Sequence, residues 1–420
     1  MGRLLAVALA LPVALATAAG TVAVAATGSA DRARWHLGVE AAAADFDGLP
    51  SWVDGSVGKF AAHGTEPPVR GYGEHRRHLS DTVSATLVLE ATADGIGDPV
   101  NATEAYLHWA PVPRSETRYR IKVGAFYPAL SLENTRAGWR SPYTINYSAI
   151  NTWVAEELRS TGLEVTAIKR LPSLGPRHRL ILQGSVFGGN DPAGSLLSWR
   201  GWAIHDRQTR FGDNLPLPPL PLNRPGQMFD KQAAVVEPFM EVDNRLGFTA
   251  AAEWQARGRF ALKGLYYDNR GDPEALENGQ YGWDTRFWSV GARLAFPKKV
   301  TLLAQWMQGN TGMGPLMSGK HAIDNNFESH YLLLSRKLGP HRLSARYDRF
   351  RVDDVDIVTA DDNNERGSAW TLAHRFTFSE RMQAATEWAR IETSRANLVF
   401  NGFRAREVET LFQIRLQLAL

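Results

Sequence analysis

The chain has 420 residues, of which 22% are charged and 44% hydrophobic, and it contains no cysteine. Its 47 basic and 44 acidic residues give a formal net charge of +3, which disfavours nucleic-acid binding because that requires a concentrated basic face. The lack of cysteine excludes a disulfide framework and thiolate metal sites.

The first residues have the pattern of a secretory signal peptide. Arg3 precedes an apolar run over 4–16, and small residues follow, with Ala23 and Ala25 offering an A-x-A cleavage site. The alternative, a membrane-spanning helix, is disfavoured because the apolar core is well short of the roughly 20 residues that cross a bilayer. We therefore expect residues 1–25 to be a signal peptide.

Beyond residue 30, apolar and polar residues alternate with a period of two instead of forming a long apolar run. In 367–378, Trp370 and Leu372 alternate with Thr371 and Arg375. Strands with one apolar and one polar face can cross a membrane only as a closed barrel, because lipid offers no partner to an unpaired backbone group. The last strand, 408–420, keeps this alternation to its apolar terminal residue, as transmembrane barrels commonly do.

Short and long connections also alternate. Tight polar turns recur about 41 residues apart, at 256–258, 296–299, 338–340 and 378–380. Between them lie longer polar segments, at 269–280, 310–326, 351–366 and 393–407. This is typical of outer-membrane barrels, which have short periplasmic turns and long external loops.

The sequence therefore predicts an all-β fold, a transmembrane antiparallel β-barrel of 16 strands formed by residues 83–420. The N-terminal segment 26–82 could contribute a further pair, 34–45 and 69–79, which would make 18 strands. The sixteen predicted strands are 83–93, 104–110, 117–127, 162–170, 177–188, 193–205, 236–243, 246–256, 258–269, 281–296, 299–309, 327–338, 340–350, 367–378, 380–392 and 408–420.

Two segments do not fit simple connections. The Pro-rich segment 206–235 is too long for a periplasmic turn, so it is a polyproline spacer, an inward-folded plug, or the result of a misplaced neighbouring strand. Segment 128–161 is rich in aromatic and charged residues, and we expect it to fold into the lumen as a constriction loop. Its alternatives are a loop packed over the barrel mouth or a short helix at 150–159.

Basic residues outnumber acidic ones on the predicted wet faces, so the lumen should attract anions weakly. The alternative is that these side chains pair with acids and only fill a solvated wall. We expect Arg120, Lys122, Arg136 and Arg140 near the narrowing. The predicted pore-lining and constriction residues are Arg118, Arg120, Lys122, Glu133, Arg136, Arg140, Arg179, Arg342, Arg346 and Arg375.

The tryptophans fit a membrane-spanning barrel. Trp306, Trp370 and Trp388 fall on apolar faces toward the outer ends of their strands, where an aromatic girdle meets the headgroups. The alternative is ordinary core packing in a soluble β-sandwich.

Several motifs resemble the phosphate-selective porin O and P family in their order and spacing. They lie at 76–79, 104–107, 119–128, 131–133, 156–159 and 161–165. The resemblance implies an outer-membrane barrel, commonly trimeric, that passes small anionic solutes. Segment 128–161 departs from the phosphate-specialised pattern because it has no lysine, and Leu420 replaces the more usual terminal aromatic residue.

No nucleophile elbow, P-loop or zinc-protease motif occurs, so we predict neither an enzyme nor a bound cofactor or metal. The close pair His75 and His78 lacks further ligands for a metal site. We predict a porin in the outer membrane of a Gram-negative bacterium, contacting outer-membrane lipids and small anionic solutes, as a homotrimer. The alternative is a closed barrel with a structural, adhesive or hydrolytic role, the last through a pair such as Ser344 and a neighbouring histidine.

Overall fold

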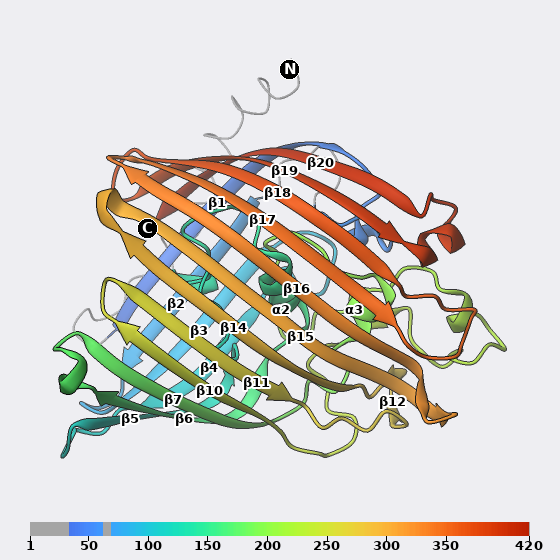
Figure 1. Ribbon diagram of the computed structural model, residues 1–420, viewed down its shortest axis with the longest axis horizontal. Coiled ribbons are helices and arrows are strands. Elements are labelled where there is room, and N and C mark those ends of the chain that lie inside the picture. Colours follow the sequence, from blue (N-terminus) through green and yellow to red (C-terminus); the bar gives the residue numbers. More distant parts are fainter. Residues whose placement is uncertain (1–32, 62–68, 420) are drawn as a thin grey trace.

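The computed structural model describes residues 33–61 and 69–419. Within them, sixteen strands form one closed antiparallel barrel in which β20 pairs with β1 (Figure 1). The strands are β1 (Ala33–Asp47), β2 (Val69–His78), β3 (Val83–Thr92), β4 (Val100–Trp109), β5 (Thr117–Phe126), β6 (Ser160–Arg170), β7 (His178–Gly188), β10 (Gly247–Ala256), β11 (Phe260–Asp268), β14 (Asp284–Phe296), β15 (Val300–Met317), β16 (Lys320–Leu338), β17 (His341–Asp354), β18 (Glu365–Thr377), β19 (Met382–Arg395) and β20 (Arg406–Ala419). The predicted all-β class and sixteen-stranded antiparallel barrel are confirmed.

The sixteen strands are not all the predicted ones. The optional segments 34–45 and 69–79 are β1 and β2, whereas 193–205 and 236–243 contribute no strand to the barrel. Residues 195–199 instead form a short helix, α3 (Ser195–Trp199), whose side chains are all buried. These apolar runs were misread because they pack inside the barrel, and a short buried run has no periodicity that separates strand from other structure. The predicted signal peptide, 1–25, and Leu420 lie outside the described residues.

Connections at one end of the barrel are short and those at the other are mostly long. The turns predicted at 256–258, 296–299, 338–340 and 378–380 are confirmed. The loop predicted at 310–326 is wrong, because β15 and β16 continue through it as a hairpin that reverses at Ser318 and Gly319, both with positive φ. Residues 311–314 and 322–325 of this hairpin are buried, so the polar, Gly-rich composition here belongs to paired strands and not to a loop.

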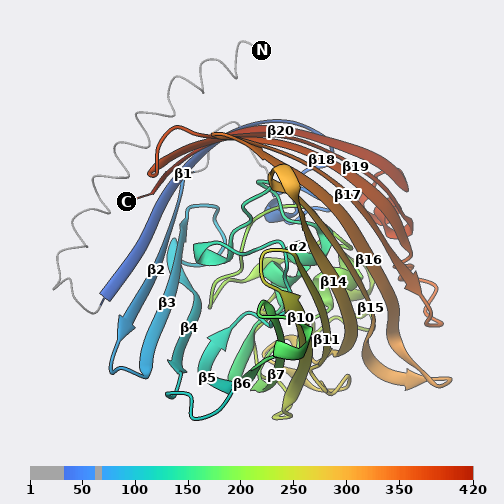
Figure 2. The same cartoon turned by 60° about the vertical axis from the view of Figure 1, so that its left-hand side comes forward.

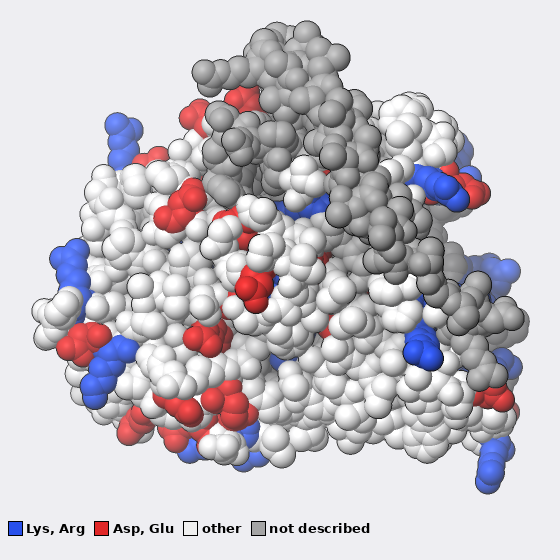
Figure 3. Space-filling model, turned by 180° about the vertical axis from the view of Figure 1, so that it is seen from behind, with Lys and Arg blue, Asp and Glu red and all other residues white. Residues whose placement is uncertain are grey.

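Outward and inward side chains alternate along the barrel wall. On β18, Trp370 and Leu372 are 52% and 49% exposed, while Thr371 between them is fully buried on the inner side. The outer face shown in Figure 3 carries mostly uncharged residues, with Lys and Arg mainly toward its left and right margins. Outward aromatic rings meet across neighbouring strands, as Tyr347 and Trp370 do with centroids 4.9 Å apart. The outer surface is therefore suited to lipid.

Two long segments fold into the barrel. Segment 127–159 contains helix α2 (Ala149–Glu157), which lies inside the ring of strands and contacts β16 and β17 (Figure 2). Segment 189–246 contains α3 and two short paired strands, β8 (Leu215–Pro216) and β9 (Val235–Val236). A third short pair, β12 (Leu276–Glu277) and β13 (Gln280–Tyr281), lies in the β11–β14 connection. No helix among the described residues is long and apolar enough to cross a membrane.

Aromatic packing joins the two inward segments to the wall. Trp153 of α2 packs edge-to-face against Phe287 of β14 and Phe327 of β16, and its ring also meets Trp202 of segment 189–246. Two of the three alternatives for the Pro-rich segment 206–235 are observed. The segment folds into the barrel, and the neighbouring strands predicted at 193–205 and 236–243 were misplaced. The interior is therefore largely a packed core, leaving limited space for a water path.

The outward placement of Leu372 predicts that a charge there is costly. Leu372→Arg should destabilise the folded barrel in lipid vesicles by about 2–4 kcal/mol, as for Arg near a bilayer midplane. Ser368→Arg, on the same face of β18 but beyond Trp370, should cost only about 0–1 kcal/mol. Urea unfolding in vesicles measures both, and equal costs would contradict this placement.

Candidate functional site

A chamber of about 650 Å³ lies at the short-turn end of the barrel. It is lined by β1, β2, β19 and β20 and by the start of the inward segment 127–159, including Tyr72, Arg136, Gln383 and Gln417. These residues, except Gln383, also line a void of about 20 Å³ that reaches Arg140 and Arg375. Such a void holds about one water molecule, so the path narrows sharply here.

Two arginines at this narrowing, Arg136 and Arg375, and a third beside it, Arg342, form no ion pair with a carboxylate among the described residues. Arg136 Nη1 and Arg375 Nη1 both donate to Gln383 Oε1, at 3.1 and 3.4 Å. Arg342, opposite Arg375 in the β17–β18 register, donates to Ser335 Oγ at 3.1 Å and lies over the Tyr143 ring. We call Arg136, Arg342 and Arg375 the arginine triad.

The triad concentrates positive charge without a direct ion pair, although Glu74 and Glu380 also line the chamber. Arg375 is only 8% exposed, and its Nη2 donates to backbone oxygens of the inward segment, at 3.1 Å to Ser141 and also to Thr144. Neutral acceptors orient a guanidinium but leave its charge uncompensated. A hydrated anion entering the chamber would supply the missing countercharge, and guanidinium groups can bind it in a bidentate manner.

A second group of arginines around the same void forms ion pairs with carboxylates. Arg140 contacts Glu40 at 3.0 Å and Glu90 at 2.9 Å, and its guanidinium lies 4.2 Å from the centroid of the Tyr72 ring. Arg415 bonds both Glu40 and Asp206. Because this charge is compensated, we assign Arg140 to the structure of the narrowing and not to anion attraction.

Asp206 joins the second inward segment to this network. Arg70 of β2 lies 3.0 Å from Asp206, and Arg415 of β20 also pairs with it. Burial alone would raise the pKa of Asp206, but these two guanidinium groups hold that pKa well below its usual range. The carboxylate therefore stays charged and fixes segment 189–246 to two neighbouring regions of the wall.

Glu133 and Arg346 hold the first inward segment in place. Arg346 Nη1 contacts Glu133 at 2.8 Å, and Arg346 Nε contacts Asp348 at 2.7 Å, with all three side chains fully buried. Arg346 also donates to the backbone oxygens of Asn146 and Tyr147, at 2.8 and 2.7 Å. These side chains do not contact solvent, so we correct their predicted place: they support the constriction loop instead of lining a water path.

Glu133 also organises the start of α2. Its carboxylate accepts from the backbone N–H of Ser148 at 3.0 Å and from Asn151 Nδ2 at 2.9 Å. The Ser148 side chain in turn caps the helix by accepting from the Asn151 N–H. One buried carboxylate thus couples the helix N-terminus to the Arg346 guanidinium in the wall.

The C-terminal end of α2 contacts the second inward segment. Glu156 pairs with Arg200 at 2.5 Å and with His205 Nε2 at 2.6 Å. Burial would raise the pKa of Glu156, but Arg200 and His205 lower it to about 2. Burial raises the pKa of neighbouring Glu157 to about 7, although its carboxylate accepts from the Leu196 N–H near the start of α3.

The remaining predicted residues lie on other parts of the lumenal wall. Lys122 pairs with Glu164 at 3.2 Å, and Arg179 donates to Gln255 at 2.6 Å. Arg118 and Arg120 share the inward face of β5 with Lys122, are exposed, and form no ion pair within the described ranges. None of these four lines the chamber, so the structure does not bring the β5 cluster together with Arg136.

Sequence reasoning missed several residues of the narrowing. Glu40 and Tyr72 lie on β1 and β2, which were only optional strands, and Asp206 lies in the unassigned Pro-rich region. The alternation of β1 could have indicated that Glu40 faces the lumen. Gln383 is uncharged and gave no indication of its position between Arg136 and Arg375.

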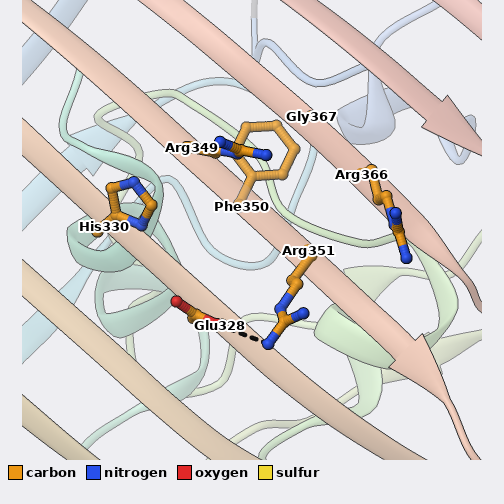
Figure 4. A pocket seen from close by; sticks show the side chains of 7 residues that line it. All are labelled: Glu328, His330, Arg349, Phe350, Arg351, Arg366 and Gly367. Carbon is orange, nitrogen blue, oxygen red and sulfur yellow. Dashed lines mark ion pairs between the residues drawn. The ribbon is translucent and has the colours of Figure 1, made fainter.

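A separate pocket of about 340 Å³ opens on the outer face of β16, β17 and β18 (Figure 4). Arg351 pairs there with Glu328 at 2.8 Å, and His330, Arg349 and Arg366 complete a polar rim. These side chains point away from the lumen, so this pocket is not part of the water path. Ser344 is instead lumenal and donates to Ser335, and no serine–histidine hydrogen bond occurs in the described part of the chain.

Comparison with solved structures found similar outer-membrane proteins. The outer membrane channel DcaP of Acinetobacter baumannii matches with a TM-score of 0.53 at 10% identity, over 92% of this chain and 97% of that one. An anion-selective porin from Comamonas acidovorans matches with a TM-score of 0.48 at 10% identity, over 92% and 99% of the two chains. A loop-deletion mutant of OmpT, an outer membrane protein of Vibrio cholerae, matches with a TM-score of 0.49 at 8% identity, over 93% and 100%.

A scan of protein-family models and a search of curated proteins each found no match. The likeness to DcaP shows that the chain has the fold of an outer-membrane channel. The resemblance of the motifs to the phosphate-selective porins is treated below.

The Arg346 network predicts that the constriction loop depends on one buried guanidinium. Arg346→Met leaves Glu133 and Asp348 buried without their partner, which typically costs about 3–5 kcal/mol. We expect the loop to loosen, giving protease cleavage within 127–159 and noisier channel currents. Arg349→Met, on the same strand but outward, should change neither, and an intact loop in the Arg346 variant would contradict the anchoring role.

The low pKa of Glu156 predicts acid release of the inward segments. Its pKa falls from 4.5 to about 2 on folding, so its stabilisation is complete above about pH 4.5 and is lost as the pH falls toward 2. Glu156→Gln should remove most of this acid dependence, on the order of 3 kcal/mol. Protease sensitivity measured across this range tests it, with Glu116→Gln in a short turn as control. An unchanged pH profile in the Glu156 variant would overturn the assignment.

Proposed function

We propose that this chain is an outer-membrane porin through which small hydrophilic solutes diffuse passively, with a preference for anions. The observation that carries the proposal is the arginine triad, three guanidinium groups that form no ion pair within the described residues: Arg136 and Arg375 line the narrow void, and Arg342 lies opposite Arg375 on the neighbouring strand. Positive charge fixed at a constriction raises the local concentration of anions and excludes cations. No chemical step is required of these residues, and the proposed function is non-enzymatic.

Phosphate is one candidate solute. It is supported by the resemblance of the motifs around 119–165 to the phosphate-selective porin O and P family and by the capacity of guanidinium groups to hold phosphate. The triad consists of arginines alone, and segment 128–161 contains no lysine. We therefore propose that the channel prefers small anions in general, including phosphate, and is not selective for a single anion.

We further propose export through the signal peptide at 1–25, residence in the outer membrane of a Gram-negative bacterium, and assembly as a homotrimer. The outer faces of the short strands β4, β5 and β6 expose Leu107, Val123 and Leu163 at about half of their surface. A wall with such an apolar outer face suits lipid or a second copy of the chain.

The narrow void favours one alternative, a barrel that is shut in its resting state. Two inward segments occupy the lumen, and the void at the triad has room for about one water molecule. A closed barrel with a structural, adhesive or hydrolytic role would give no ion current. The same recording therefore separates the two proposals.

Planar-bilayer recording tests the proposal directly. The purified protein should conduct, and its reversal potential in asymmetric KCl should indicate anion preference. Replacing two of the three uncompensated charges, in Arg136→Gln with Arg375→Gln, should lower the anion-to-cation permeability ratio several-fold, because the fixed field at the narrowing weakens.

Arg349→Gln removes one charge from the outer face and should leave selectivity unchanged. The pair Arg120→Gln with Lys122→Gln tests the second lumenal group and should have the smaller effect, since Lys122 is already paired with Glu164. Cation preference in the unmodified protein would sink the anion proposal, and absence of current would favour the closed barrel.

A further inference from the structure

Three carboxyl groups meet where segment 189–246 enters and leaves the barrel mouth. Asp191 lies just after β7, and Glu241 and Asp243 lie shortly before β10. One ligand oxygen from each lies within 4.8 Å of the others. The chain thus brings together acids that are about 50 residues apart in sequence, at the neck of its second inward segment.

Asp191 is a buried carboxylate with one free oxygen. The residue is 0% exposed, and its Oδ2 accepts from the backbone N–H groups of Val242 and Asp243, at 2.6 and 3.3 Å. Its Oδ1 is also buried but has no hydrogen-bond partner. An unpaired buried carboxylate oxygen is costly, so this atom calls for a ligand.

The cluster lacks a compensating cation. No Lys, Arg or His within the described ranges forms an ion pair with Asp191, Glu241 or Asp243. The nearby Arg245 guanidinium contacts Asp272 instead, at 2.6 Å. Three carboxyl groups held this close without a cation repel one another when they are charged.

The backbone holds the other two carboxylates in fixed positions. Glu241 accepts from the N–H groups of Gly189 and Asn244, at 2.6 and 2.7 Å. Asp243 accepts from the Arg245 N–H at 2.7 Å and from the Asp272 N–H. Each of these oxygens keeps a second lone pair, so the carboxylates remain able to bind a cation.

We propose that Asp191, Glu241 and Asp243 bind a calcium ion that closes the neck of segment 189–246. All donors are hard carboxylate oxygens, and flexible, irregular oxygen sites suit Ca²⁺ better than Mg²⁺, which demands near-octahedral geometry and keeps its water. Closing a long loop at its base stabilises it by restricting the chain ends. The inference is independent of which solute, if any, the barrel passes.

Metal titration of the refolded, full barrel in detergent tests the proposal. Calorimetry with CaCl₂ should show one saturable site, with MgCl₂ binding more weakly. The backbone N–H of Trp283 donates to the backbone carbonyl oxygen of Asp191 at 2.8 Å, so this tryptophan lies close enough to sensitise bound Tb³⁺. Calcium should displace the Tb³⁺ luminescence and protect segment 189–246 from protease.

Asp191→Asn and Asp243→Asn preserve side-chain shape and should weaken calcium binding by at least about tenfold. Glu274→Gln, an exposed acid in the adjacent β11–β14 connection, is the matched control and should bind normally. A heat-dependent shift in gel migration first confirms that each variant is folded. If a variant does not fold, the calcium titration of the unmodified protein tests whether the site exists. Absence of saturable calcium binding, or equal binding by folded Asp191→Asn, overturns the site, and equal Mg²⁺ affinity overturns the choice of calcium.

Discussion

Closure of the backbone hydrogen-bond ladder between β1 and β20 is the constraint on which the rest of the structure depends. Val39 opposite Leu418 and Phe46 opposite Leu411 belong to a continuous register that leaves no strand edge open. In a bilayer an open edge would expose unpaired N–H and C=O groups to lipid. Closure of sixteen strands also leaves a wide interior, and in this chain two inward segments fill much of it.

The two inward segments pack inside the barrel, and buried ion pairs fix their positions. Each inward segment is held by wall residues of opposite charge: Glu133 of the first by Arg346, and Asp206 of the second by Arg70 and Arg415. Buried ion pairs are weak contributors to net stability but costly to break, so they favour one arrangement of the loops over others. Arg140 differs from the arginine triad in the same respect, because it forms ion pairs with carboxylates and the triad does not.

The alternation of side chains predicted the barrel and four of its turns, because lipid and lumen impose a strict period of two on each strand. The predicted number of sixteen strands is also observed, with β1 and β2 in place of 193–205 and 236–243. It failed where residues are buried on both sides. Segment 193–205 is apolar because Leu197, Trp199 and Trp202 pack inside the lumen, and that composition does not distinguish a strand from an irregular buried segment. Pairings across the lumen, such as Arg140 with Glu40, depend on three-dimensional closure that local patterns do not contain.

The distribution of arginine charge also explains why counting lumenal arginines could not locate the site. Arg346, Arg140 and Arg375 all face inward, yet the first two are neutralised by carboxylates and only Arg375 has neutral partners. A paired charge contributes little to the field in the water path, whereas an unpaired one in a confined space acts with little screening. In the proposed function, an anion is therefore attracted by the guanidinium groups around Gln383 that form no ion pair, one of which, Arg136, belongs to the inward segment 127–159.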